Sequence, residues 1–153
     1  MKKIEFQDYL DIVNLLQDYV NAIDHGDVDG ILARFTPDAH WDFSPSQQRY
    51  GHDDIRDFFK DRFSEFARTH HLCGPPRLTL QDDGSIHSVA YIQASHFLAD
   101  GKPYNMRGRY VDLLRRHDGR WLIARRSVIV HMQEGSDREF TYLQRKPRPV
   151  SGV

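Results

Sequence analysis

The chain has 153 residues, 22 acidic and 21 basic side chains, and a formal net charge of -1. This length suits one domain with an internal small-molecule pocket, and the balanced charge argues against nucleic acid or a membrane surface as partner. The single cysteine, Cys73, excludes an intramolecular disulfide, and no stretch approaches the roughly 20 apolar residues of a membrane span. The start MKKIEFQDYL lacks the apolar run of a signal peptide, so we expect a cytoplasmic location.

The first half of the chain is predicted to be mainly helical. Apolar residues recur at three- and four-residue steps over 6–23, which indicates an amphipathic helix. A shorter helix should follow, with Asp27 as its N-cap and Ile31, Leu32 and Phe35 on its buried side. TPDAHWDF is typical of a turn into a short strand, and residues 51–67 predict a third helix whose aromatic stripe is mostly core.

The second half is predicted to form strands at about 70–82, 86–98, 103–116 and 120–132. The turn sequences DDG, ADG and HDG separate them, each placed where a hairpin needs a residue tolerant of positive φ. Helices followed by an antiparallel sheet indicate an α+β domain. We expect this domain to span 1–135 and a C-terminal extension to span 136–153, ending in the basic, proline-rich RKPRPVSGV as a loose arm.

Two predicted strands carry polar residues on otherwise apolar faces. Small residues share a face of 86–98 with His96, and they would leave room beneath a curved sheet. Arg126 falls among apolar residues on one face of 120–132, while His131 belongs to the other face. An isolated buried charge is costly unless it is paired or contacts a ligand. Alternation alone does not settle which face lines a cavity, because bulges shift the parity.

An aspartate and a pair of adjacent histidines are the other candidates for chemistry. Asp24 ends the first predicted helix, either as a turn acid or as a partly buried partner for a base. A buried carboxylate that fixes an imidazole tautomer is the arrangement expected of a general base. His70 and His71 would point to opposite faces of a strand, so at most one faces a given interior.

Motifs for other chemistries are missing from the sequence. It contains no HExxH, paired CxxC, GxSxG, GxGxxG or P-loop motif. We therefore expect no metal site and no cofactor. Basic residues in LLRRHDGRW and ARRS could suggest an RNA-binding face, but the balanced total charge favours a solvated sheet edge.

Four segments, in their order and spacing, resemble the SnoaL-like domain of the nuclear transport factor two superfamily. They are YVNAIDHGDVDGILARFTPDAHWDF, GHDDIRDFF, THHLCGPP and GRYVDLLRRHDGRWLIARR, and the resemblance covers roughly 6–132. The similar branch includes scytalone dehydratase, hexachlorocyclohexane dehydrochlorinase and bile acid 7α-dehydratase. The resemblance implies an α+β cone, cystatin-like, in which N-terminal helices pack on a strongly curved, mostly antiparallel sheet. It also implies a homodimer or homotrimer.

The resemblance assigns roles to individual residues. It implies that Asp24 orients His71, which abstracts a proton, with Tyr19 assisting and no cofactor. Counting parity back from Leu78 would favour His70, but Pro75-Pro76 should break the ladder, and the spacing to this segment selects His71. The remaining implied substrate-binding residues are His96, Arg126, Phe43, Tyr110, Trp41 and His131.

This sequence also departs from scytalone dehydratase. Gly108 and Tyr110 replace a serine and an asparagine, and Phe43 replaces a tyrosine, so we expect a more apolar or aromatic ligand. The resemblance thus implies a cofactor-independent lyase, a dehydratase acting on a cyclic polyketide-like, steroid-like or aromatic-precursor small molecule. An isomerase or polyketide cyclase using the same pocket, and a non-catalytic binding or interaction module, are the alternatives.

Overall fold

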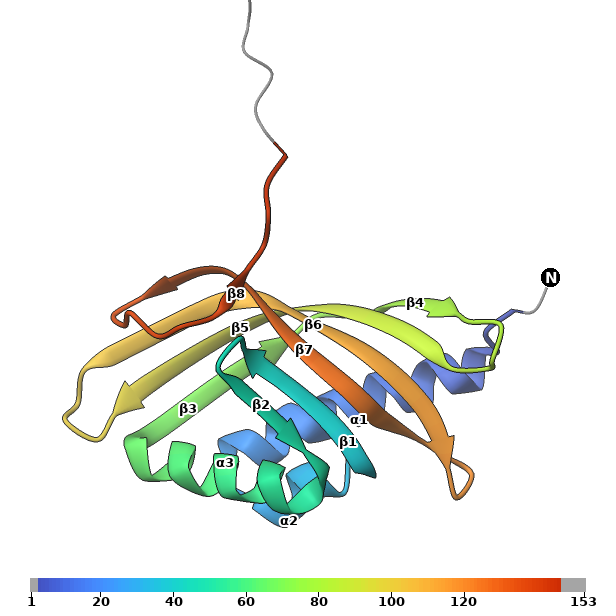
Figure 1. Ribbon diagram of the computed structural model, residues 1–153, viewed down its shortest axis with the longest axis horizontal. Coiled ribbons are helices and arrows are strands. Elements are labelled where there is room, and N and C mark those ends of the chain that lie inside the picture. Colours follow the sequence, from blue (N-terminus) through green and yellow to red (C-terminus); the bar gives the residue numbers. More distant parts are fainter. Residues whose placement is uncertain (1–2, 147–153) are drawn as a thin grey trace, which may run out of the picture.

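In the computed structural model, which describes residues 3–146, three helices cover the concave face of one strongly curved sheet (Figure 1). The helices are α1 (Phe6–Asp24), α2 (Val28–Leu32) and α3 (Gly51–Glu65). The predicted stripe of α1 is buried, and Asp27 caps α2 by accepting a 2.8 Å hydrogen bond from the Gly30 amide. The helix α3 stops two residues before its predicted end, because Phe66 is already extended and begins a strand.

The sheet has eight strands in a mixed arrangement. They are β1 (Phe35–Ser44), β2 (Gln47–Tyr50), β3 (Phe66–Cys73), β4 (Arg77–Leu80), β5 (Ile86–Leu98), β6 (Pro103–His117), β7 (Arg120–Glu134) and β8 (Thr141–Tyr142). The order is β2-β1-β7-β6-β5-β3, with β4 also on β5 and β8 also on β7. Only β1–β7 and β7–β8 are parallel among the described pairs. The predicted α+β class and the curved, mostly antiparallel sheet are confirmed.

The three predicted hairpin turns are also present. Gly84, Gly101 and Gly119 have φ of +83°, +82° and +77°, a backbone conformation that a side chain would strain. Within residues 3–146, no helix is both long enough and apolar enough to cross a membrane. The predicted loose arm lies mostly outside the described residues.

The prediction of one strand over 70–82 is wrong, and the error matters for the two adjacent histidines. The chain forms two strands on the same side of β5, with Cys73 opposite Ile92 and Arg77 opposite Val89. Arg77 therefore lies four residues after Cys73, but the residues of β5 opposite them, Val89 and Ile92, are only three residues apart. Gly74-Pro75-Pro76 takes up the extra residue, since proline cannot donate to the ladder.

This extra residue inverts the parity between β3 and β4. Thr69, His71 and Cys73 face inward, whereas His70 is exposed on the outer face. On β4 the partly buried residues are Leu78 and Leu80, at even positions. Counting back from Leu78 would therefore have placed His70, rather than His71, on the inner face.

Candidate active site

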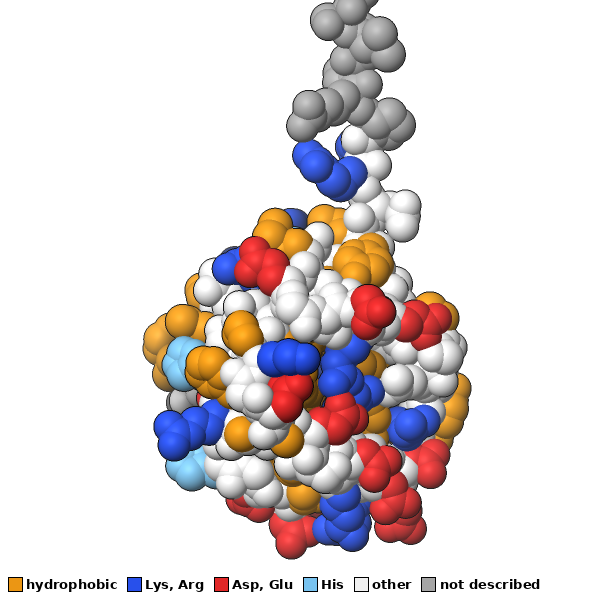
Figure 2. Space-filling model, turned by 90° about the vertical axis from the view of Figure 1, so that its left-hand side faces the viewer, with side chains coloured by type: hydrophobic (Ala, Val, Ile, Leu, Met, Phe, Trp, Pro, Cys, Tyr) orange, Lys and Arg blue, Asp and Glu red, His pale blue; other side chains and the backbone are white. Residues whose placement is uncertain are grey.

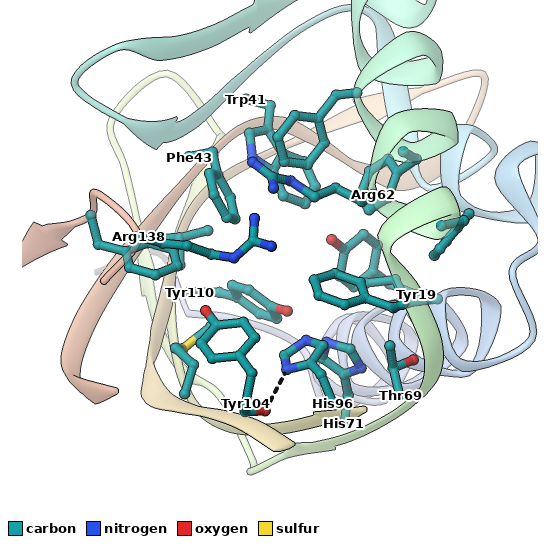
Figure 3. Close-up of a pocket in the computed structure, with 18 residues that line it drawn as sticks. Tyr19, Trp41, Phe43, Arg62, Thr69, His71, His96, Tyr104, Tyr110 and Arg138 are labelled. Atoms are coloured by element: carbon teal, nitrogen blue, oxygen red, sulfur yellow. Dashed lines mark hydrogen bonds between the residues drawn. The ribbon is translucent and has the colours of Figure 1, made fainter. Parts of the chain in front are cut away.

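A cavity of about 70 Å³ lies between the helices and the concave face of the sheet (Figure 3). Its walls are mainly aromatic. Six of the predicted site residues line it: Tyr19, Trp41, Phe43, His71, His96 and Tyr110. One water needs roughly 10–15 Å³, so the cavity has room for about five waters or for a small ligand.

Asp24 and His71 come from different elements and meet at the wall of this cavity. Asp24 is the last residue of α1, and His71 faces inward from β3, opposite the small Ala94 of β5. The Asp24 Oδ1 to His71 Nδ1 distance is 2.7 Å. The His71 amide donates to Asp24 Oδ2 at 2.9 Å, and the Thr69 hydroxyl donates to Oδ1 at 2.9 Å. The carboxylate is thus held from three directions.

These contacts set the electrostatics of the pair. Burial is the largest single effect on Asp24 and opposes ionisation, but the hydrogen bonds from the His71 ring, the His71 amide and Thr69 outweigh it and lower the pKa of the carboxyl. A carboxylate accepts only, so His71 Nδ1 must carry the proton that it shares with Asp24. In the neutral ring, the other nitrogen, Nε2, is an acceptor. The side chain of His71 is only 7% exposed and lines the cavity.

His96 lies next to His71 on β5, with the two ring centroids 5.5 Å apart. Its Nδ1 lies 3.1 Å from the Tyr104 carbonyl oxygen, so Nδ1 carries the proton and Nε2 is an acceptor. Burial, and secondly the charge of His71, lower the pKa of His96 to about 4. His96 is therefore neutral near pH 7 and has no acidic proton to give to a leaving group.

Two buried donors of the cavity wall, the Tyr19 hydroxyl and Trp41 Nε1, have no acceptor at hydrogen-bond distance among the described residues, although the Tyr19 hydroxyl lies close to Arg126 and Tyr110. Burial, followed by the neighbouring Tyr110, raises the pKa of Tyr19 well above its usual value. The hydroxyl therefore stays protonated near neutral pH. An oxygen atom of a ligand would satisfy such a donor, which otherwise carries the cost of an unmade hydrogen bond.

The structure corrects the expectation that Arg126 binds substrate. Its side chain is fully buried and does not line the cavity. It forms two hydrogen bonds to Asp112, Nε to Oδ1 at 2.8 Å and Nη2 to Oδ2 at 2.7 Å. The guanidinium lies 4.2 Å from the ring centroid of Tyr19 and 3.9 Å from that of Tyr110. Arg126 therefore supports the cavity wall from behind, and Asp112 explains the charge on an apolar face.

His131 also lies away from the cavity. On β7 the inward residues around it are Val128 and Val130, so His131 points to the outer face of the sheet. Its ring packs against Tyr91 there, with centroids 5.4 Å apart. The expectation that His131 contacts a ligand in the cavity is corrected.

Sequence reasoning missed two basic residues of the cavity wall, Arg62 and Arg138. The sequence could have indicated Arg62. It lies four residues after Phe58 and three after Phe59, which places it on the aromatic face of α3. No sequence pattern indicated Arg138, since it follows β7 in a segment expected to be an extension. Phe140 from the same segment also lines the cavity, so this part of the chain completes the site.

No group of three or more histidine, cysteine or acidic side chains is placed to hold a metal ion within residues 3–146. The cysteine is buried, and burial raises the pKa of its thiol. A thiol in that state is a weak nucleophile.

Comparisons with solved structures find the same fold. A candidate scytalone dehydratase from Novosphingobium aromaticivorans is 18% identical, with a TM-score of 0.85 over 90% of this chain and 94% of that one. A candidate aromatic ring hydroxylase from Novosphingobium aromaticivorans is 28% identical, with a TM-score of 0.83 over 88% of this chain and 96% of that one. A hexachlorocyclohexane dehydrochlorinase is 14% identical, with a TM-score of 0.74 over 90% of this chain and 97% of that one.

The names of these neighbours cover different reactions, so the shared fold does not specify one. No significant match is found among curated proteins. The model of the SnoaL-like domain matches residues 5–127, which is most of the chain. This match shows that the chain belongs to the SnoaL-like domain family.

Proposed function

We propose that this protein is a cofactor-independent lyase, a dehydratase, that acts on a small cyclic compound. The observation that carries the proposal is the 2.7 Å contact between Asp24 and His71 at the wall of an aromatic cavity. Of the three substrate classes implied by the sequence, the small, mainly aromatic cavity favours the aromatic precursors over the larger steroid-like compounds.

In the proposed reaction, His71 Nε2 takes a proton from the carbon next to a carbonyl group. The electrons of the broken C–H bond form a C=C bond, and the hydroxyl on the neighbouring carbon leaves. Asp24 stabilises the imidazolium formed on His71. The imidazolium then gives its proton to the departing hydroxyl, which leaves as water, so the base returns to its starting state.

The other polar groups have supporting roles in this proposal. The Tyr19 hydroxyl, which has no acceptor at hydrogen-bond distance among the described residues, donates to the carbonyl oxygen as negative charge develops on it. His96 accepts a hydrogen bond from a substrate hydroxyl through Nε2, because its pKa of about 4 leaves it neutral. This division assigns proton transfer to His71 and orientation to the other two side chains.

The same pair could return the proton to another carbon, which would make the protein an isomerase. If the carbanion instead attacked an internal carbonyl carbon, whose oxygen then took the proton from His71, the protein would be a cyclase. A binding module predicts that Asp24 and His71 lie apart or that side chains fill the pocket. Neither feature is observed, because the pair is in contact and the cavity is open. The geometry therefore favours an enzyme over a binding module.

The test is a screen of small ring compounds that carry a hydroxyl two carbons from a carbonyl, read by mass spectrometry. We expect a product lighter by one water, and loss of at least about 100-fold of the rate in His71→Ala. His70→Ala is the matched control, because it removes the exposed neighbour on the outer face. Full activity of His71→Ala would contradict the mechanism, and a product of unchanged mass would identify an isomerase or a cyclase.

A further inference from the structure

Two arginines from distant segments face the same cavity. Arg62 comes from the last turn of α3, and Arg138 follows β7. Figure 3 shows both guanidiniums across the cavity from His71 and His96. Their side chains are 13% and 23% exposed, so both lie partly out of solvent.

Aromatic rings hold both guanidiniums in place. Arg62 lies 5.2 Å from the ring centroid of Phe43 and 5.0 Å from that of Phe58. Arg138 lies 5.4 Å from the ring centroid of Phe66 and 5.5 Å from that of Tyr104. The positions of the charges are thus fixed before any ligand binds, which lowers the entropy cost of binding.

The two positive charges share one carboxylate. Glu65 accepts hydrogen bonds from Arg62 and Arg138, but it is not part of the cavity wall. Gln47, the other recorded partner of Arg62, is neutral. Burial and the nearby charge of Arg138 lower the pKa of Arg62, as expected for two cations with too few anions. Figure 2, which views this end of the molecule, shows basic and acidic side chains side by side.

We infer that Arg62 and Arg138 bind a carboxylate of the substrate, so that the protein acts on small cyclic acids. Guanidinium groups match a carboxylate in geometry as well as in charge, and among residues 3–146 the cavity wall contains two of them and no carboxylate. The aromatic rings between the two ends would cover the ring of the acid. This inference rests on the proposed function for its reacting end, because it places the carboxylate across the cavity from His71.

The inference can be tested without the natural substrate, using benzoate and its neutral counterpart benzamide as probes. Binding of each is measured by calorimetry, with fluorescence of Trp41, a residue of the cavity wall, as a second readout. We expect benzoate to bind at least about tenfold more tightly than benzamide, since hydrogen bonds to charged groups are the stronger kind. Equal affinities would overturn the inference.

Variants show whether the arginines cause this preference. Arg62→Gln and Arg138→Gln should each remove most of it, and Glu65→Gln should tighten benzoate binding by freeing both guanidiniums from their shared partner. Arg68→Gln is the control with the same change in charge, because Arg68 is exposed on β3. Benzoate binding unchanged in both Arg138→Gln and Glu65→Gln would contradict the inference, and melting curves verify that each variant is folded.

The His71→Ala variant separates this inference from the proposed function. It should keep the preference for benzoate, because His71 lies at the other end of the cavity. Preference for benzoate together with full lyase activity in this variant would refute the mechanism and leave the carboxylate site intact. Loss of activity without any preference in the wild-type protein would refute the carboxylate site alone.

Discussion

Two acid–base pairs in this protein have the same spacing but different surroundings. The nitrogen–oxygen distance is 2.7 Å both in His71–Asp24 and in Arg126–Asp112. In the first pair, His71 lines the cavity, and its side chain is 7% exposed. The second has no exposed surface and is covered by Tyr19 and Tyr110. The two pairs thus differ in access to the cavity, and the first is the one placed to contact a ligand.

The pairs also differ in whether they contain a basic group that can exchange a proton. The hydrogen bonds to Asp24 leave His71 with an open nitrogen toward the cavity. In the other pair, burial opposes the charge of Arg126, but Asp112 more than offsets this and raises the pKa of the guanidinium. Arg126 therefore stays charged and cannot exchange a proton in any accessible pH range. Its role is structural, because it packs against Tyr19 and Tyr110 behind the cavity wall.

The largest expected effect is on the stability of the buried pair. Asp112→Asn leaves the Arg126 guanidinium buried without its counter-charge, and we expect a loss of about 3–5 kcal/mol in the free energy of unfolding, measured in urea. The control is Asp29→Asn, which breaks an exposed pair with Arg56 and should cost at most about 1 kcal/mol. A loss in Asp112→Asn as small as that of the control would show that burial does not distinguish the two pairs.

The second effect concerns His96, the histidine whose ring packs beside His71 of the cavity pair. Its pKa of about 4 in the folded protein lies below the ordinary 6.5, so the unfolded chain takes up the proton first. This stabilisation is complete above pH 6.5 and is lost as the pH falls toward 4. The loss should approach about 3 kcal/mol.

Urea unfolding at several pH values measures this loss in the wild-type protein and in His96→Phe. The variant keeps an aromatic ring against Phe66 and Tyr104 but cannot titrate. Its stability should fall less between pH 6.5 and 4 than that of the wild type. The same pH dependence in both proteins would mean that His96 titrates normally.

The smallest effect comes from Tyr19, which touches both regions. Its ring covers Arg126 and its hydroxyl belongs to the cavity wall. Tyr19→Phe keeps the ring, so the free energy of unfolding should change by less than about 1 kcal/mol, while kcat of the lyase reaction should fall by about 10- to 100-fold. A large loss of stability with unchanged kcat would place Tyr19 with the structural pair instead.

Much of the fold could be predicted from the sequence, because it depends on local patterns of residues. The stripe of α1, the cap at Asp27 and the three glycine turns follow from residue spacing and backbone preference. The strands β2 and β8 and the parallel β1–β7 pairing were not predicted. Pairing between segments far apart in the chain leaves no periodic signal in either of them. The two prolines predicted a break after Cys73, but the sequence did not show that the break takes up one extra residue.

The site was predictable in part for the same reason. His96 on a small-residue face and Arg126 on an apolar face were visible from alternation, but the partner of Arg126 was not foreseen. Asp112 lies on the inward face of β6, opposite Arg126, and only the register of the two strands brings them together. Arg138 reaches the cavity from a segment with no pattern at all, so sequence alone could not place it.

The most direct test of the central claim is the release of a hydrogen label from the carbon next to the carbonyl of a confirmed substrate. The account predicts release by the wild-type protein and a rate at least about 100-fold lower in Asp24→Asn, since the variant no longer stabilises the imidazolium. Asp18→Asn, which alters an exposed acid of the same helix, should release the label at the wild-type rate. Release by Asp24→Asn at the wild-type rate would contradict the account.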